Sequence, residues 1–414
     1  MSPFVPLPRE ITTTEARKDE QFYHKEQLPI GAPLKDKSYT ELAGDSKDIP
    51  ALFTPYKLGN LTLKNRIAVA PMCMYSSSNG FFNDFHLVHL GSLALHGVGL
   101  ITTEATAVAP EGRISGNDAG LWSDEHIHGL KRIVDFAHRT HTPVSVQLAH
   151  AGRKASTRPP WLGNGDRKAV PPEDPEGWEV LGPSAVAFSD GYNLPHEMTV
   201  DQIRQTVQDF AEAAKRVEKA GADAIELHFA HGYLASTFLS PNSNKRTDQF
   251  GGSFENRSRF HVEVVRAVRE VWPTKPLLVR ISTTEWVKDV PSWDIEESIK
   301  FSKLMIDEGV DLIDCSSGGI SEAQVFPTDR LDFQIPHAER IHREAGVPTG
   351  AVGFINDPIQ ANEIISSGKS DLVFIAREFL RNPGWTIEAA SKLGVRIALA
   401  NQFARAGINR PSHP

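Results

Sequence analysis

Eight short apolar runs, separated by longer helix-like stretches, constrain the fold of this chain more than any other feature of its sequence. The runs are rich in Val, Ile and Leu and lack strict polar alternation, which is typical of strands buried on both faces of a parallel sheet. They span residues 67–70, 99–103, 144–148, 224–227, 277–281, 312–315, 349–352 and 372–375. Eight strands alternating with helices predict an α/β fold, the (β/α)₈ TIM barrel. A doubly wound open sheet is the alternative.

The stretches between these runs carry helical periodicity. It is clearest in residues 199–220, where Ile203, Val207 and Phe210 recur on one face. Further helices are expected at residues 124–138, 256–271, 295–308, 336–345 and 358–367.

The periodic pattern also divides the chain into segments. Residues 51–405 are expected to form the barrel, after an N-terminal extension (1–50) that is polar and partly irregular, and before a C-terminal tail (406–414). A hairpin at 58–63 would cap the barrel bottom. Residues 153–198, rich in Pro and Gly, form a long insertion after the third strand. An insertion there lies on the catalytic face and predicts a lid or pocket wall; a surface elaboration without function is the alternative.

Composition excludes several classes of function. The formal net charge is −8 and no extended basic run occurs, so no nucleic-acid partner is expected. Cys73 and Cys315 are the two cysteines, too few for a disulfide framework, a Cys₄ zinc site or a four-cysteine iron–sulfur cluster. No apolar stretch of about 18 residues predicts a membrane span. A reduced, cytoplasmic location is therefore expected.

Polar residues follow most of the predicted strands. A TIM barrel builds its active site at these C-terminal strand ends. In chain order they are Cys73 and Tyr75, Glu104 and Ala105, Gln147 and His150, His228, His231 and Tyr233, Arg280, Ser316 to Gly319, Gly353, and Ala376 with Arg377.

Two histidines three residues apart, His228 and His231, with Tyr233 just beyond them, are the strongest catalytic candidates. Metal ligation is the rival interpretation. It requires a third ligand, and acidic residues would then dominate the other strand ends. Those ends carry Cys, Gln, Arg and Gly instead, so no metal is predicted.

Arg280 lies inside an apolar strand, where a buried guanidinium needs an anionic or strongly polar partner. A phosphate or an electron-rich ring edge would serve; a salt bridge with Glu226 or Asp314 is the alternative. Glycines after strands 6 and 7 allow backbone N–H groups to approach a phosphate. No complete GxGxxG and no Walker A motif occurs. The pattern favours a mononucleotide held by barrel loops.

Several long motifs carry a family resemblance. They are residues 70–76 (APMCMYS), 147–154 (QLAHAGRK), 228–234 (HFAHGYL), 239–253 (LSPNSNKRTDQFGGS) and 314–318 (DCSSG). On these motifs the chain resembles the old yellow enzyme family (NADH:flavin oxidoreductase/NADPH dehydrogenase), in its thermophilic-like branch of FMN-dependent ene-reductases. The resemblance covers about residues 52–405.

The resemblance implies a tightly bound FMN, reduced by NADPH or NADH, that passes hydride to an activated alkene such as an enone, maleimide or nitroalkene. Catalytic roles fall to His228 and His231, which would bind the activating oxygen, to Tyr233 as proton donor, and to Cys73 near flavin N5. Tyr75 would assist substrate binding. The implied flavin contacts are Ala70, Pro71, Met72, Cys73 and Ala105, the polar-edge residues Gln147 and Arg280, and the phosphate residues Gly318, Gly353, Ala376 and Arg377.

The chain departs from the family pattern at three places. Ala376 replaces a glycine, and the first 50 residues have no counterpart in shorter members. Residues 402–405 resemble a tail that places an arginine in a neighbouring subunit's active site, with Phe403 in place of tyrosine. Arg405 is accordingly a predicted substrate-binding residue, and a homodimer or homotetramer is expected.

Two rival functions remain at this point. A 2,4-dienoyl-CoA reductase-like enzyme would need an iron–sulfur cluster and further domains, which the cysteine count and the length oppose. A non-enzymatic barrel that binds a flavin as a sensor or scaffold would not need Cys73, His228, His231 and Tyr233.

Overall fold

The computed structural model describes residues 28–35, 42–43, 48–162, 169–328 and 331–406. Within these residues, eight parallel strands close into a barrel because β4 pairs with both β3 and β6. Each predicted apolar run forms one of them. They are β3 (Ile67–Val69), β4 (Leu100–Thr102), β6 (Val144–Ala149), β9 (Ala224–Phe229), β10 (Leu277–Ser282), β11 (Leu312–Ser316), β12 (Thr349–Val352) and β13 (Leu372–Ile375).

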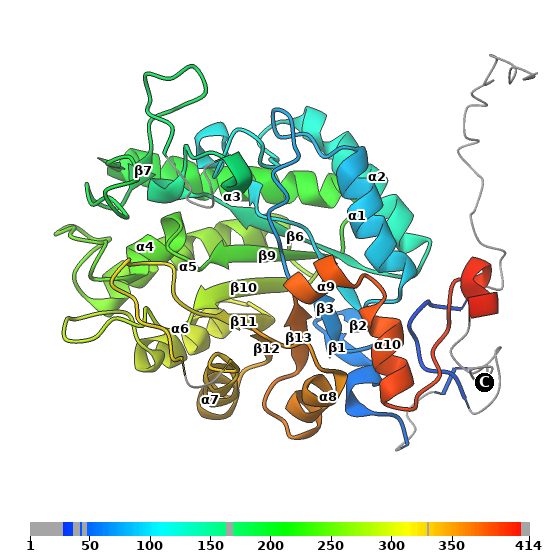
Figure 1. Ribbon diagram of the computed structural model, residues 1–414. Helices are drawn as coiled ribbons and strands as arrows, with labels where there is room; N and C mark the ends of the chain where they lie inside the picture. Colours follow the sequence, from blue (N-terminus) through cyan, green and yellow to red (C-terminus); the bar gives the residue numbers. More distant parts are fainter. Residues whose placement is uncertain (1–27, 36–41, 44–47, 163–168, 329–330, 407–414) are drawn as a thin grey trace, which may run out of the picture.

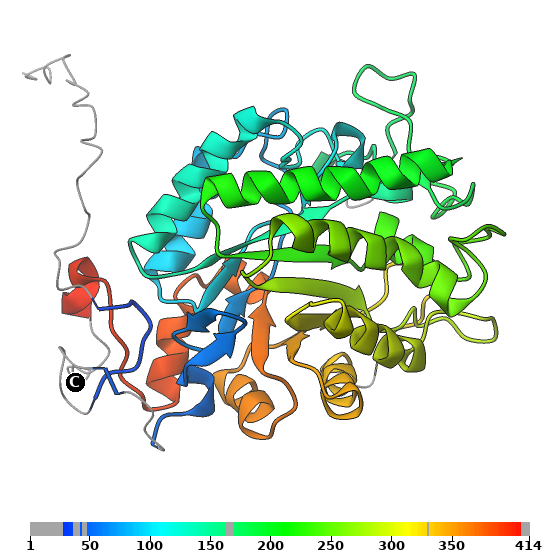
Figure 2. The same cartoon turned by 180° about the vertical axis from the view of Figure 1, so that it is seen from behind.

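Helices surround this barrel on the outside (Figures 1 and 2). They are α1 (Asp84–Leu95), α2 (Ile127–His138), α3 (Val200–Ala220), α4 (Leu234–Leu239), α5 (Phe254–Val271), α6 (Ile295–Asp307), α7 (Ile335–Ala345), α8 (Pro358–Ser366), α9 (Arg377–Arg381) and α10 (Trp385–Lys392). The TIM barrel prediction is confirmed. No helix in these described ranges has the length and apolar character needed to cross a membrane.

Helix boundaries follow local capping chemistry. Helix α3 begins after Thr199, whose side-chain oxygen accepts from the backbone N–H of Gln202. In return, the side-chain oxygen of Gln202 accepts from the backbone N–H of Thr199. This capping box satisfies two otherwise unpaired groups of the helix end. The helix stops at Gly221, which adopts a left-handed conformation with φ +82°.

Helix α1 was not predicted from the sequence. Its buried residues include Leu90 and Leu93, yet Phe85 and Val88 are exposed. Apolar side chains therefore stand on more than one face, and the periodic signal of an amphipathic helix is lost.

Side chains alternate between the barrel interior and the outer core. A cluster of apolar side chains, including Ala224, Leu278 and Leu312, fills the bottom of the interior. The predicted hairpin, β1 (Tyr56–Leu58) and β2 (Leu61–Leu63), packs Leu58 and Leu63 against this cluster and caps it.

The insertion after β6 has little regular structure. It contains two 3₁₀ turns, Gly152–Lys154 and Pro160–Leu162, and a two-stranded pair, β7 (Leu181–Gly182) with β8 (His196–Glu197). A further short strand, β5 (Thr106–Ala107), pairs with β6 at the mouth of the barrel.

Segments from the two ends of the chain lie together beside the barrel (Figures 1 and 2). The backbone of Gly31 donates to the carbonyl of Ala398, and Ala398 donates to Ala32, each at 2.8 Å. Asn65, fully buried, donates its side-chain amide to the carbonyls of Gly31 and Gly97. The described part of the predicted N-terminal extension is thus fastened to the barrel and to the segment that follows α10.

Candidate active site

The register of β9 brings its polar residues to the barrel interior. Glu226 and His228 face inward, while Leu227 and Phe229 belong to the outer core. The chain then makes a tight turn in which His231 has φ +63° and Gly232 has φ +72°. A Cβ on Gly232 would lie 2.1 Å from the carbonyl oxygen of Gly319, so only glycine fits there.

This turn brings the predicted catalytic residues together. The ring centroids of His228 and His231 lie 5.1 Å apart, and those of His228 and Tyr233 lie 5.2 Å apart. The Nε2 of His231 lies 2.7 Å from the hydroxyl oxygen of Ser316. Within the described part of the chain, the buried Nδ1 of His228 has no hydrogen-bond partner. A buried polar atom of this kind indicates a site that a ligand completes.

Two cationic side chains, those of Arg280 and Lys154, lie near His228. Burial, with Arg280 and Lys154 nearby, keeps the pKa of His228 well below its ordinary value, so the ring is neutral at pH 7. A neutral imidazole donates from only one ring nitrogen.

Lys154 is a site residue that the sequence analysis quoted only as part of a motif. Its Nζ donates to the carbonyl oxygens of His231 and Gly319, each at 2.9 Å, and lies 5.4 Å from the ring centre of Tyr233. This ammonium therefore ties the β9 turn to the loop after β11.

Tyr75 and the insertion complete the mouth of the barrel. Tyr75 is buried in one cluster with Tyr233, and Cys73 packs against that cluster. From the insertion, Trp161 places its ring 5.7 Å from that of Tyr75 in an edge contact. The insertion thus reaches a predicted substrate-binding residue, as a pocket wall would.

Buried charged and polar groups lie beside and below His228 in the barrel interior: Arg280 is the register partner of His228, and Gln147 is that of Glu226. Gln147 donates from Nε2 to Glu226 Oε1 at 2.7 Å, and the Nε of Arg280 lies 3.2 Å from Asp314 Oδ2. The salt bridge to Asp314, one of the two alternatives for Arg280, is therefore present. Burial raises the pKa of both carboxyls; Asp314 raises that of Glu226 further, and Arg280 opposes both shifts.

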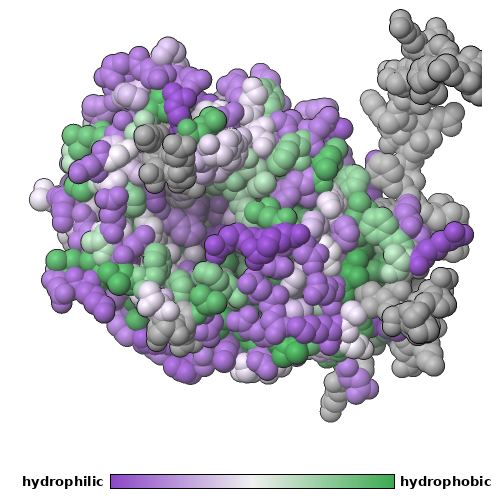
Figure 3. Space-filling view, viewed as in Figure 1, coloured by the Kyte–Doolittle hydropathy of each residue, from purple (hydrophilic) through white to green (hydrophobic). Residues whose placement is uncertain are grey.

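A cavity of about 490 Å³ opens where β12 and β13 end. Its walls include the predicted cofactor residues Arg280, Gly353, Ala376 and Arg377, and Ser316 from the predicted strand ends, together with Gln334, Phe354 and Arg381, which were not predicted from the sequence. A recess with hydrophilic residues along its border is visible near the centre of the face in Figure 3.

The cavity fits a phosphate-bearing group. Three guanidinium groups, those of Arg280, Arg377 and Arg381, stand on its walls. Gly353 has φ +112°, and a Cβ there would lie 2.3 Å from Gln334 Nε2, so the backbone is left open to a close ligand. Loops after strands 7 and 8 are the usual phosphate site of this fold.

The other predicted cofactor residues lie outside the walls of this cavity. Pro71, Met72 and Cys73 follow β3, and Ala70 donates its N–H to the carbonyl of Ile375. Ala105 lines a second, smaller cavity instead. Gly318 faces Phe326 and Gln324, because a Cβ on it would lie 2.7 Å from the Phe326 ring.

Two further expectations concern Arg405 and the possibility of a metal site. Arg405 is exposed in the last 3₁₀ turn, Asn401–Ala406. In the part of the chain that the structure describes, no group of three or more His, Cys, Asp or Glu side chains is placed to hold a metal ion, so the metal interpretation of the histidine pair gains no support.

The (β/α)₈ barrel thus combines a basic cavity suited to a phosphate-bearing ligand with a cluster of two histidines and a tyrosine. The sequence model of the NADH:flavin oxidoreductase / NADH oxidase family matches residues 51–395. An NADPH dehydrogenase of Geobacillus thermodenitrificans is 46% identical over 358 residues, 86% of this chain and 98% of the relative. One of Bacillus cytotoxicus is 45% identical over 359 residues, covering 86% and 96%. The solved structure of morphinone reductase is 26% identical, with a TM-score of 0.67, and covers 85% of this chain and 92% of its own.

The chain belongs to the NADH:flavin oxidoreductase / NADH oxidase family. It is an oxidoreductase that uses FMN and NAD(P)H. This excludes the non-enzymatic interpretation.

Proposed function

We propose that this oxidoreductase is an ene-reductase, which reduces the C=C bond of an alkene activated by a carbonyl or nitro group. When bound, FMN supplies the hydride chemistry: it accepts a hydride from NAD(P)H and delivers one to the β-carbon of the alkene. The observation that carries the proposal is the cluster of His228, His231 and Tyr233 at the barrel mouth, with ring separations of 5.1 and 5.2 Å.

The residues of this chain would hold the cofactor at two places. Arg377, Gly353 and Arg280 border the cavity that fits its phosphate-bearing arm. Gln147 and Arg280, each oriented by a buried carboxyl group, would contact the polar edge of the ring system. Their donors suit an edge that carries carbonyl oxygens and a ring nitrogen.

The two histidines would act on the activating oxygen of the alkene. Negative charge builds on this oxygen as hydride arrives at the β-carbon, and fixed N–H donors stabilise that charge. The neutral ring of His228 keeps one N–H that can act as such a donor. Tyr233, buried beside His228, would protonate the α-carbon from its hydroxyl.

The two half-reactions test this assignment when each is measured alone. In His228→Ala, reoxidation of the reduced protein by cyclohexenone should slow by about 10²–10³, the usual loss for one such donor. Reduction by NADPH should slow far less. The exposed His128 on α2 provides the matched control, and His128→Ala should leave both rates unchanged. Equal losses in both half-reactions of His228→Ala would contradict the oxygen-binding role.

A further inference from the structure

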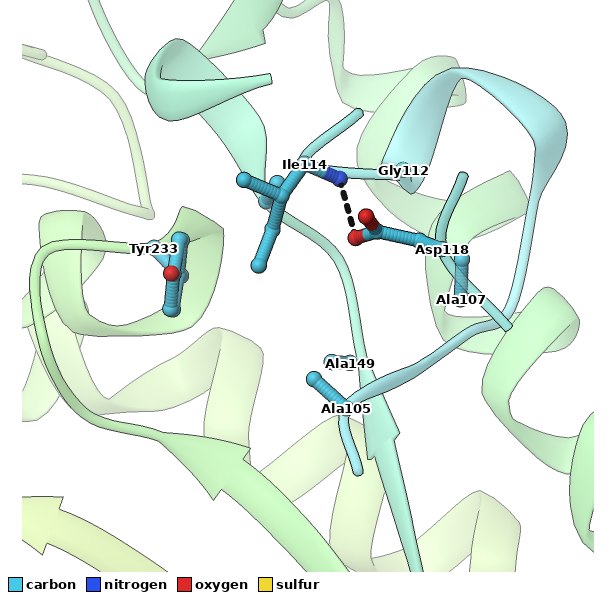
Figure 4. Close-up of a pocket in the computed structure, with 8 residues that line it drawn as sticks. Ala105, Ala107, Gly112, Ile114, Asp118, Ala149 and Tyr233 are labelled. Atoms are coloured by element: carbon cyan, nitrogen blue, oxygen red, sulfur yellow. Dashed lines mark hydrogen bonds between the residues drawn. The ribbon is translucent and has the colours of Figure 1, made fainter. Parts of the chain in front are cut away.

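A second cavity has Tyr233 in its wall and shares no lining residue with the basic cavity. It offers about 10 Å³ to a water-sized molecule, and Tyr233 and Asp118 both line it. Figure 4 shows these two side chains on opposite sides of the space, with Ile114, Ala105 and Ala149 around it. A space of this size holds about one water, which needs polar partners. Tyr233 and Asp118 are the two lining residues whose side chains carry polar groups.

Asp118 is a buried acid whose hydrogen bonds come from uncharged donors. It is 2% exposed. Its Oδ2 accepts from the backbone of Ile114 at 2.8 Å, and its Oδ1 accepts from the Ser115 hydroxyl at 2.7 Å and the Ser115 N–H at 3.1 Å. Burial raises the pKa of Asp118 to about 7, against the lowering effect of these hydrogen bonds. Near neutral pH, the carboxyl is thus poised between its two protonation states.

The titratable groups packed around Asp118 do not duplicate this property. Burial lowers the pKa of His150 to about 4, so that ring is neutral and holds no transferable proton at pH 7. Arg113 donates to the carbonyl of Pro110 and lies over the Trp178 ring. Glu104, whose charge also raises the pKa of Asp118, lies 3.3 Å from His86. Tyr233 stands across the cavity.

Asp118 also lies close to solvent. Its neighbours Gly116 and Asn117 are exposed, while Asp118 itself faces the cavity. The exposed residues beside Asp118 in the chain are where a proton from bulk water would reach the carboxylate.

We propose that Asp118 supplies, through one water in this cavity, the proton that Tyr233 gives to the α-carbon of the alkene. The inference rests on the proposed ene-reductase function. As the α-carbon forms its C–H bond, the tyrosine O–H bond breaks. The phenolate takes a proton from the cavity water, and the water takes one from the carboxylic acid. Solvent then returns a proton to the carboxylate, so the cycle consumes one solvent proton for each alkene.

A purely architectural role is the competing explanation, because Asp118 also organises the turn at residues 114–118. The pH profile of alkene-driven reoxidation separates the two. If Asp118 acts as the proton source, reoxidation by cyclohexenone slows as the pH rises through about 7, because the acid form disappears. This decline is the alkaline limb of the pH profile, and Asp118→Asn should remove it.

Ser115→Ala gives a sharper readout than loss of the carboxyl. The Ser115 hydrogen bond lowers the pKa of Asp118, so its removal should shift the limb to higher pH without abolishing it. Asn117→Ala is the matched control: it disturbs the same turn through its bond to the Ser77 carbonyl but leaves the carboxyl contacts intact. It should keep the limb of the native protein.

A double-mutant cycle tests whether Asp118 acts through Tyr233. Adding Asp118→Asn to Tyr233→Phe should cause no further slowing, because the recipient of the proton is already absent. FMN content and thermal unfolding of each variant report separately on folding. Additive losses, or a limb that stays in place in both Asp118→Asn and Ser115→Ala, would overturn the inference. A native protein that fails to reduce any alkene would instead refute the proposed function.

Discussion

Gln147 donates a 2.7 Å hydrogen bond from its Nε2 to Oε1 of Glu226, inside the barrel and below His228. Both side chains are at least 98% buried, with exposures of 2% and 0%. The amide is thereby fixed on a strand rather than on a loop, and its remaining polar atoms are oriented by the barrel itself. Binding groups held this way suit a planar ligand edge that must be met at fixed positions.

Glu226 should be a source of pH-dependent instability. Burial and Asp314 raise its folded-state pKa above the ordinary 4.5, so its contribution is complete below pH 4.5 and is lost as the pH rises toward the folded value. Glu226→Gln keeps an oxygen acceptor for Gln147 and should flatten this dependence. Glu226→Ala leaves the Gln147 amide unpaired and should cost about 1–3 kcal/mol. Thermal unfolding of the protein at pH 5.5 and pH 8 measures both; the same loss on raising the pH in Glu226→Gln and in the native protein would refute the assignment.

Gly353 should be needed for tight binding of FMN. In Gly353→Ala the methyl group enters a backbone with φ +112° and meets Gln334, beside three arginines. We expect FMN to bind at least about tenfold more weakly, a loss of about 1.4 kcal/mol. Gly346→Ala is the control, since Gly346 has φ +68° but open space around it. Titration of the apoprotein with FMN, followed by flavin fluorescence, distinguishes them; equal affinities in the two variants would argue against a phosphate site here.

Trp161 should act on substrate binding rather than on the chemical step. Its ring contacts Tyr75 while 62% of the residue remains exposed. Trp161→Ala should raise KM for the alkene with a smaller effect on kcat, and FMN affinity should not change. The adjacent Leu162, exposed to 61%, provides the control substitution. If steady-state kinetics show the same parameters for both variants, the insertion does not form part of the substrate pocket.

Ile30 should hold the C-terminal segment in place. It is fully buried with Ala400, and Leu95 and Phe403 pack against the pair. Ile30→Ala should destabilise this contact by about 2–5 kcal/mol and speed proteolysis near residues 400–406. Leu42→Ala, at an exposed position of the same extension, should not. Limited proteolysis followed by mass spectrometry locates the cut sites, and unchanged cleavage in Ile30→Ala would contradict this role.

The barrel and the grouping of His228, His231 and Tyr233 could be predicted from sequence because strand burial leaves a direct pattern. Runs such as 277–281 are apolar on both faces, and polar residues at their ends must then face the barrel mouth. The long motif around His228 added the roles of individual residues.

The remaining features depend on tertiary contacts that no local pattern encodes. Lys154 reaches His231 across 77 positions of the chain, and Trp161 reaches Tyr75 from an irregular insertion. Helix α1 gave no signal because apolar residues stand on several of its faces. Asp118 was not predicted, because the cavity that it lines forms only when the turn at residues 114–118 folds against Tyr233.

One anaerobic titration decides whether the protein reduces alkenes. The FMN-loaded protein is first bleached with one equivalent of NADPH, and cyclohexenone is then added without oxygen. We expect the flavin absorbance to return and one equivalent of cyclohexanone to form for each flavin. A protein that stays bleached until oxygen enters, with no saturated product from enones, maleimides or nitroalkenes, would contradict the proposed function.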